Sequence, residues 1–200
     1  MALNPNGFTM RLTASPRGVR VRAMASVRPP PPELAPPELA PPEMAPPELA
    51  PPKLAPMELA LHEARAAAEL DEVPVGAVLV DSASGEVLAR AHNRVEALHD
   101  PTAHAEMLVI GAAARRLGLK RLTGADLYVT LEPCPMCAAA ISLARLRRLY
   151  FGAYDAKGGG VEHGPRIFEQ STCHHRPEVI GGLDETRCAA LLKAFFVARR

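Results

Sequence analysis

The sequence feature that most constrains the fold is a pair of short motifs that together supply one histidine and two cysteines. His104 is followed by Glu106, and Pro133 and Cys134 are followed by Cys137, so the pattern is His-x-Glu and then Pro-Cys-x-x-Cys. One imidazole and two thiolates are three of the four ligands of a tetrahedral zinc site, and such a set leaves one position for water. The fold must therefore bring both motifs to one point in space.

The spacing within the motifs favours a catalytic metal site over a structural one. Zinc lowers the pKa of a bound water to about 7, so that hydroxide is available near neutral pH. Glu106 lies two residues beyond His104, where its carboxylate can take a proton from that water without binding the metal. A histidine alone is more often a core or surface residue, and a Cys-x-x-Cys pair alone could be a redox pair or half of a structural zinc knuckle. Neither alternative explains Glu106 or Pro133.

Signals for the start of a helix accompany both motifs. Asp100 and Pro101 predict the N-cap and first position of a helix that carries His104, and Pro135 predicts a helix that begins at the Cys-x-x-Cys pair. Two helix N-termini would then point at one spot. Their partial positive charge favours thiolate and hydroxide there.

After residue 56, helical and strand patterns alternate along the chain. Helices are predicted over residues 57–72, 103–117, 136–146 and 184–199. Strands are predicted over 75–81, 86–93, 126–131, 148–153 and, at an edge, 179–181, with the first two joined as a hairpin. This alternation predicts an α/β fold with helices on both faces of a sheet.

The first 56 residues differ in composition from the rest. Residues 1–28 hold five arginines and no acidic residue, which is typical of an organelle transit peptide but also of upstream translation of a GC-rich gene. Residues 29–56 hold 13 of the 21 prolines in a Pro-Pro-Glu-Leu-Ala repeat, which favours polyproline II and buries too little apolar surface to fold. We predict a basic disordered segment over 1–28, a disordered or polyproline II linker over 29–56 and one folded domain over 57–200. The Pro-x-x-Pro spacing leaves a proline-binding partner open for residues 29–56.

Charge and cysteine content narrow the function classes. From residue 57 onward there are 17 Lys and Arg against 18 Asp and Glu, so bulk charge gives no support to nucleic-acid binding. Any RNA contact must come from local clusters such as Arg145, Arg147 and Arg148. Four cysteines, two of them in the metal motif, indicate a reducing compartment rather than a disulfide framework. No apolar run is long enough to cross a bilayer, so we expect no membrane association.

Residues 57–200 resemble the bacterial tRNA-specific adenosine deaminases of the cytidine/deoxycytidylate deaminase superfamily. Besides the two zinc motifs, the matching stretches are residues 72–78, 92–94, 151–157, 175–176 and 188–192, together with 195–196. The resemblance implies hydrolytic conversion of the wobble adenosine in a tRNA anticodon loop to inosine. It also implies a cytidine deaminase-like three-layer α/β/α sandwich with a mixed central sheet, here preceded by the disordered Pro-rich tail. The family further implies one Zn²⁺ per subunit, a homodimer and a cytoplasmic location, or an organelle if residues 1–28 are a transit peptide.

The resemblance assigns roles to individual residues. The zinc ligands would be His104, Cys134 and Cys137. Glu106 would transfer protons, Asn93 would hydrogen-bond the target base, Val73 would pack against that base, and Asp155 would contact the anticodon backbone. An asparagine at a strand end can also simply satisfy a turn. Residues 158–165 depart from the small-residue and serine run that is usual in the family. This departure affects the expected contacts with RNA more than the expected deamination reaction.

Two other functions stay open at this point. The same zinc motifs occur in deaminases of a free nucleobase or nucleoside, such as guanine, cytosine or cytidine. An assay would distinguish them, because only a tRNA enzyme modifies an anticodon stem-loop while leaving free nucleosides unchanged. The second of these alternatives is a non-catalytic role, in which zinc only stabilises the fold and the protein binds partners through its proline-rich tail. A fourth protein ligand at the metal site would favour that function.

Overall fold

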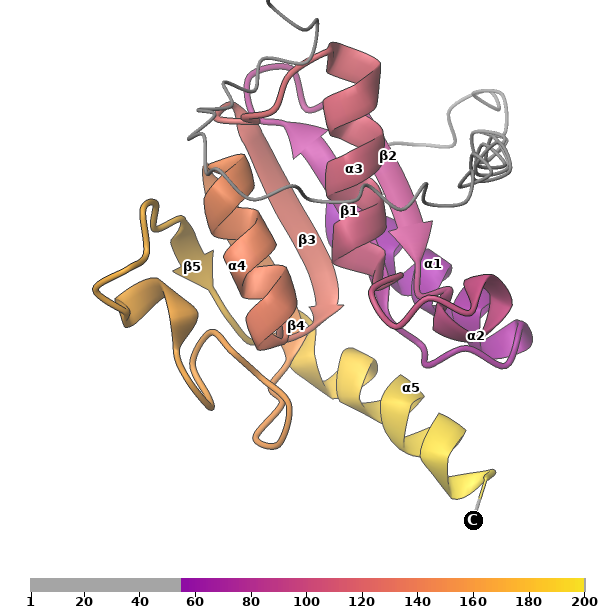
Figure 1. Ribbon diagram of the computed structural model, residues 1–200. Helices are drawn as coiled ribbons and strands as arrows, with labels where there is room; N and C mark the ends of the chain where they lie inside the picture. The colour runs from indigo at the N-terminus through magenta and orange to yellow at the C-terminus, as the bar shows by residue number, and fades with distance from the viewer. Residues whose placement is uncertain (1–54, 200) are drawn as a thin grey trace, which may run out of the picture. The chain divides into compact units, whose positions relative to one another are not determined.

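The computed structural model describes residues 55–199 (Figure 1), so the predictions for 1–28 and for the repeat segment up to residue 54 lie outside the described residues. The helices and strands are α1 (Pro56–Glu69), β1 (Gly76–Asp81), β2 (Val87–His92), α2 (Val95–Leu98), α3 (Ala105–Leu117), β3 (Ala125–Leu131), α4 (Pro135–Ala144), β4 (Arg148–Ala153), the 3-10 helix η1 (Ile167–Glu169), β5 (Glu178–Ile180) and α5 (Glu185–Val197). No helix in this part of the chain has the length and hydrophobicity that crossing a membrane requires.

The strands form one mixed five-stranded sheet in the order β2-β1-β3-β4-β5. The pairs β2–β1 and β1–β3 are antiparallel, and the predicted hairpin is present with an irregularity in register at Leu79 and Val80. The pairs β3–β4 and β4–β5 are parallel. Because a parallel pair needs a crossover connection, α4 passes over the sheet between β3 and β4.

Helices cover both faces of the sheet, which confirms the predicted three-layer α/β/α sandwich. In Figure 1, α3 and α4 lie on the near face, and α1 lies behind the sheet. Alternate residues of β1 belong to two different hydrophobic clusters. Ala77 and Leu79 pack in the cluster that includes residues of α3 and α4. Val78 and Val80 pack in the cluster that includes residues of α1 and α5. Since both faces are covered, five successive residues of β1 are buried.

Helix α3 begins later than predicted, and the proposed cap is wrong. The Asp100 carboxylate accepts hydrogen bonds from the amide and hydroxyl of Thr102, at 2.8 and 2.7 Å, so it closes a turn ahead of the helix. A short Asp side chain can bond to the backbone two residues on, and this competes with helix capping. The helix therefore starts at Ala105, with His104 in an extended conformation at its N-cap.

Other predicted boundaries differ by only a few residues, and Gly118 caps α3 in the left-handed region as expected, with φ 64°. The short elements α2 and η1 were not predicted. Each spans only about one turn, which is too short to show a hydrophobic period.

Candidate active site

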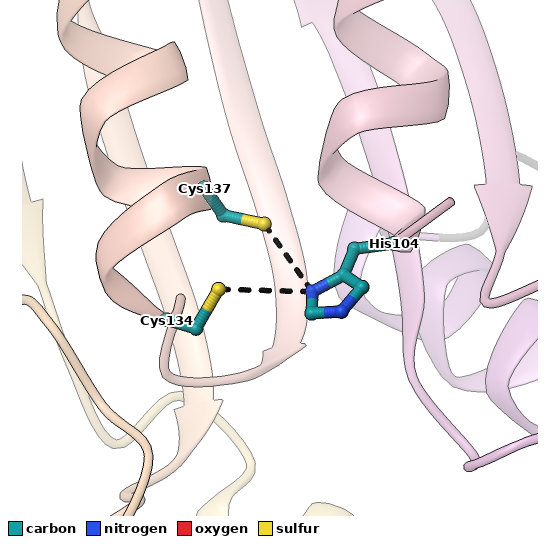
Figure 2. A group of neighbouring side chains, drawn as sticks. All are labelled: His104, Cys134 and Cys137. Atoms are coloured by element: carbon teal, nitrogen blue, oxygen red, sulfur yellow. Dashed lines mark hydrogen bonds between the residues drawn. The ribbon is translucent and has the colours of Figure 1, made fainter. Parts of the chain in front are cut away.

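The three predicted metal ligands lie together at the N-terminal ends of two neighbouring helices. Figure 2 shows the His104 imidazole facing both sulfur atoms, with its Nδ1 atom 3.7 Å from Cys134 Sγ and 3.5 Å from Cys137 Sγ. Tetrahedral zinc, with bonds of about 2.3 Å to sulfur and about 2.0 Å to nitrogen, holds such ligands roughly 3.5 Å apart. The donor set therefore fits a single zinc ion.

Local sequence accounts for this placement. Cys134 is the extended N-cap of α4, Pro135 is the first residue of the helix, and Cys137 is the third, within the same first turn. Proline suits that position because its missing N–H would have no partner inside the helix. As α3 also begins directly after His104, two helix N-termini converge on the donors and favour negative charge there.

The two thiols differ in their acidity. Hydrogen bonds from Cys137 and His104 lower the pKa of Cys134 to about 4, whereas the hydrogen bond to Cys134, together with burial, raises the pKa of Cys137. One thiolate thus opposes the ionisation of the other, so both ionise readily only when a cation binds between them. Within residues 55–199, no fourth His, Cys, Asp or Glu joins the group, as a site with room for water requires.

Glu106 lies beside these donors. It is 4% exposed in the first turn of α3, and it lines a cavity of about 620 Å³ together with His104 and Cys134. Burial raises the pKa of its carboxyl to about 6. A carboxyl with such a pKa can both take up and release a proton near neutral pH.

Asn93 and Val73, the residues that the resemblance assigns to the target base, line the same cavity. The orientation of Asn93 depends on Glu72, a buried carboxylate that sequence reasoning did not single out. One Glu72 oxygen accepts a hydrogen bond from Asn93 Nδ2 at 3.3 Å, and the other accepts one from the amide of Ala97 at 2.8 Å. In the sequence, the feature that could have pointed to Glu72 is its position directly before the apolar segment 73–80.

Asp155 also lines this cavity, in the loop after β4. Its carboxylate accepts hydrogen bonds from the amides of Lys157 and Gly158, at 3.0 and 2.9 Å. Glu132, which sequence reasoning also missed as a site residue, lines the cavity from the turn between β3 and α4.

The end of α5 contributes two further cavity residues, Phe195 and Arg199. The Arg199 guanidinium lies 3.5 Å from the centre of the Phe195 ring and pairs with Asp71. In the sequence, Arg199 and Arg200 form a further local basic cluster that could contact RNA, although charged chain ends are more often only solvated. Of the arginines proposed as an RNA-binding cluster, Arg147 and Arg148 instead form ion pairs with acidic side chains.

Comparisons with known proteins agree with this geometry. The family described as the cytidine and deoxycytidylate deaminase zinc-binding region matches residues 53–153. A tRNA-specific adenosine deaminase of Agrobacterium fabrum is 62% identical over 141 residues, which cover 70% of this chain and 91% of that protein. One from Bacillus subtilis is 50% identical over 137 residues, with 68% and 84% covered.

Two solved structures are also similar to this chain. A structure from a study of A-to-I editing by tRNA:A34 deaminases at the wobble position is 63% identical with a TM-score of 0.67, and the match covers 68% of this chain and 98% of that one. A guanine deaminase from Nitrosomonas europaea is 25% identical with a TM-score of 0.59, with 74% and 86% covered.

Proposed function

The chain belongs to the family of tRNA-specific adenosine deaminases, and from this premise we propose that it converts the wobble adenosine of a tRNA to inosine. Water and adenosine are consumed, and inosine and ammonia are formed. The observation that carries the proposal is that Glu106 lines one cavity with the metal-binding residues His104 and Cys134. We assign this activity to residues 57–200, and we propose a cytoplasmic location because the substrate is tRNA and the four cysteines are free thiols.

Zinc is the cofactor, and His104, Cys134 and Cys137 would hold it. When bound, zinc would lower the pKa of a water molecule, so that this water can lose a proton near neutral pH and its oxygen becomes the nucleophile. Glu106 takes the proton from this water and delivers it to N1 of the adenine ring. The water oxygen adds to C6, which gives a carbon that bears both a hydroxyl and the amine. Glu106 then takes the proton of this hydroxyl and passes it to the amine, and the C6–N bond breaks to release ammonia as the C6 oxygen becomes a carbonyl.

The other cavity residues recognise the nucleotide. Asn93 hydrogen-bonds the base, and Val73 packs against it opposite His104. Asp155 contacts the RNA backbone near the cavity entrance. To reach this cavity, the adenosine must turn out of the anticodon loop, and this costs least for a base that is already unpaired.

We propose that the enzyme is a homodimer that associates through the outer faces of α3 and α4. These faces carry a set of partly exposed apolar residues: Met107, Leu108, Met136, Ala139 and Ala140. A charged group, the Arg115 guanidinium, lies over Gly111 further along α3. Leu143, on the same side of α4, is 70% exposed. An apolar surface that spans two adjacent helices is typical of a protein interface.

A direct assay tests the function. Purified full-length protein is incubated with a panel of anticodon stem-loops and, separately, with free adenosine, guanine, cytosine and cytidine. We expect inosine in stem-loops with a wobble adenosine and no change in the free compounds. Glu106→Gln should keep zinc and RNA binding while turnover falls by about 10³-fold or more. Turnover of a free base with the stem-loops unchanged would instead indicate a nucleobase deaminase.

A further inference from the structure

Glu132 carries a buried carboxylate to which the proposed reaction assigns no role. Its side chain is 0% exposed, it precedes Pro133 and Cys134 in the sequence, and it does not belong to the metal-binding group. A buried carboxylate is costly unless hydrogen bonds compensate for its lost hydration. The partners that compensate Glu132 therefore indicate what it does.

Within residues 55–199, every hydrogen bond that the Glu132 side chain accepts comes from one segment, residues 155–163, which we call the anchor loop. Oε1 accepts from three consecutive amides, and Oε2 accepts from one amide and one imidazole. The donors are the amides of Val161 at 3.2 Å, Glu162 at 2.8 Å, His163 at 2.9 Å and Asp155 at 3.0 Å, and His163 Nδ1 at 2.7 Å. Consecutive amides that point at one oxygen form an anion-binding nest. Here the bound anion is a side chain of the same protein.

Glycines allow the anchor loop to approach this closely. A Cβ atom on Gly159 would lie 2.6 Å from Glu132 Oε1 and 2.5 Å from the Asp155 carbonyl oxygen. A Cβ atom on Gly160 would lie 2.6 Å from the backbone nitrogen of Pro135. The glycines at residues 159 and 160 thus leave room for the loop to wrap around the carboxylate.

The same contacts connect the anchor loop to the cavity. The amide of Asp155 is bound to Glu132 Oε2, and Asp155 and Gly158 both line the cavity. Because an ionised carboxylate can only accept, His163 Nδ1 is the donor to Glu132. The His163 ring also lies edge-on to Tyr154, with 5.9 Å between ring centres.

We propose that Glu132 and His163 form a positioning pair that holds the anchor loop, and with it Asp155, in the conformation that receives the RNA. The pair acts on RNA affinity and not on the chemical step, since neither residue belongs to the proton-transfer or metal-binding group. This inference rests on the proposed function, because it needs Asp155 to contact RNA.

Two substitutions of His163 separate its hydrogen bond from its ring packing. His163→Phe keeps a ring against Tyr154 but removes the donor. His163→Asn removes the ring but keeps an N–H donor at a similar distance from the backbone. His174→Ala is the control, because His174 is an exposed histidine of the following loop.

The dissociation constant for an anticodon stem-loop is measured by fluorescence anisotropy in a Glu106→Gln background, and kcat, KM and zinc content are measured with Glu106 intact. For His163→Phe we expect Kd and KM to rise about 10-fold, as for loss of a hydrogen bond to a charged group. We expect kcat within about 2-fold and one zinc per chain. His163→Asn and His174→Ala should match the parent protein.

Three outcomes would overturn the inference. If His163→Phe changes thermal stability but neither Kd nor KM, the pair is purely structural. If His163→Asn is impaired and His163→Phe is not, the ring and not the hydrogen bond matters. If the parent protein neither binds nor deaminates the stem-loop, the proposed function fails and this inference fails with it, whereas the first two outcomes leave the proposed function intact.

Discussion

A side-chain oxygen of Glu72 lies 3.3 Å from Nδ2 of Asn93, and both residues are buried at the active-site cavity. A carboxylate only accepts hydrogen bonds, so Glu72 determines that the NH₂ end of the Asn93 amide turns toward it. The amide oxygen must then point away from Glu72. In this way a residue that follows α1 sets the orientation of Asn93, the residue after β2 for which we propose a contact with the base.

We expect Glu72→Gln to lower kcat/KM for an anticodon stem-loop by about 10-fold or more. The glutamine oxygen is needed by the amide of Ala97, so its NH₂ group would face the NH₂ group of Asn93 and force that amide to turn. Steady-state inosine formation measures the effect. Glu69→Gln makes the same change at an exposed position of α1 and should have no effect. Equal kcat/KM values for the two variants would contradict the assigned role of Glu72.

Metal analysis should find one zinc per chain, and chelation should abolish inosine formation and lower Tm. Zinc that binds only the folded state stabilises it by about 2.7 kcal/mol when free zinc is 100-fold above its dissociation constant. Differential scanning fluorimetry with and without added zinc measures the shift. Cys137→Ser should lose zinc, whereas Cys173→Ser should retain it, because Cys173 lies outside the donor group. A zinc-dependent Tm that survives in Cys137→Ser would contradict the ligand assignment.

Two glycine substitutions should have opposite effects on the free energy of unfolding. At Gly76, a Cβ atom would lie 2.1 Å from the carbonyl oxygen of Ala60, so β1 and α1 would have to separate. We expect Gly76→Ala to destabilise the protein by about 3 kcal/mol or more. At Gly111, in the middle of α3, the nearest atom is the flexible end of Arg115 at 3.2 Å. Gly111→Ala should be neutral or stabilising by up to about 1 kcal/mol.

Urea denaturation of the zinc-loaded protein measures both values. A Gly76→Ala variant as stable as the parent would show that the sheet and α1 pack less closely than the structure describes.

The proposed dimer predicts that a charge at Leu143 prevents association. Leu143→Asp places a carboxylate on the apolar surface of α3 and α4, near the C-terminal end of α4, where burying it without a partner is costly. We expect light scattering to report a dimer for the parent protein and a monomer for this variant. Leu70→Asp is the matched control, because Leu70 is 60% exposed at the end of α1, on the other face of the sheet. A dimer that persists in Leu143→Asp would place the interface elsewhere.

The sequence by itself determined the metal site and the layers of the fold. The ligand residues stand in two short motifs, and Pro135 marks where α4 begins. Hydrophobic patterns of helical and strand period predicted every helix and strand longer than four residues among the described residues, because such patterns repeat within one element. The cap at Asp100 was predicted wrongly, since the same side chain can close a turn or cap a helix, and the motif does not choose between them.

Only the tertiary structure decided which groups support the site. The bond between Glu72 and Asn93 joins residues 21 positions apart, and the bond between Glu132 and His163 joins residues 31 positions apart. The pair of Arg199 and Asp71 spans 128 positions. No local pattern specifies such pairs, because they form only once the packing of the helices on the sheet has brought distant segments together. A buried carboxylate needs several donors at once, and those donors are backbone amides, whose direction depends on the folded path of the chain and not on residue type.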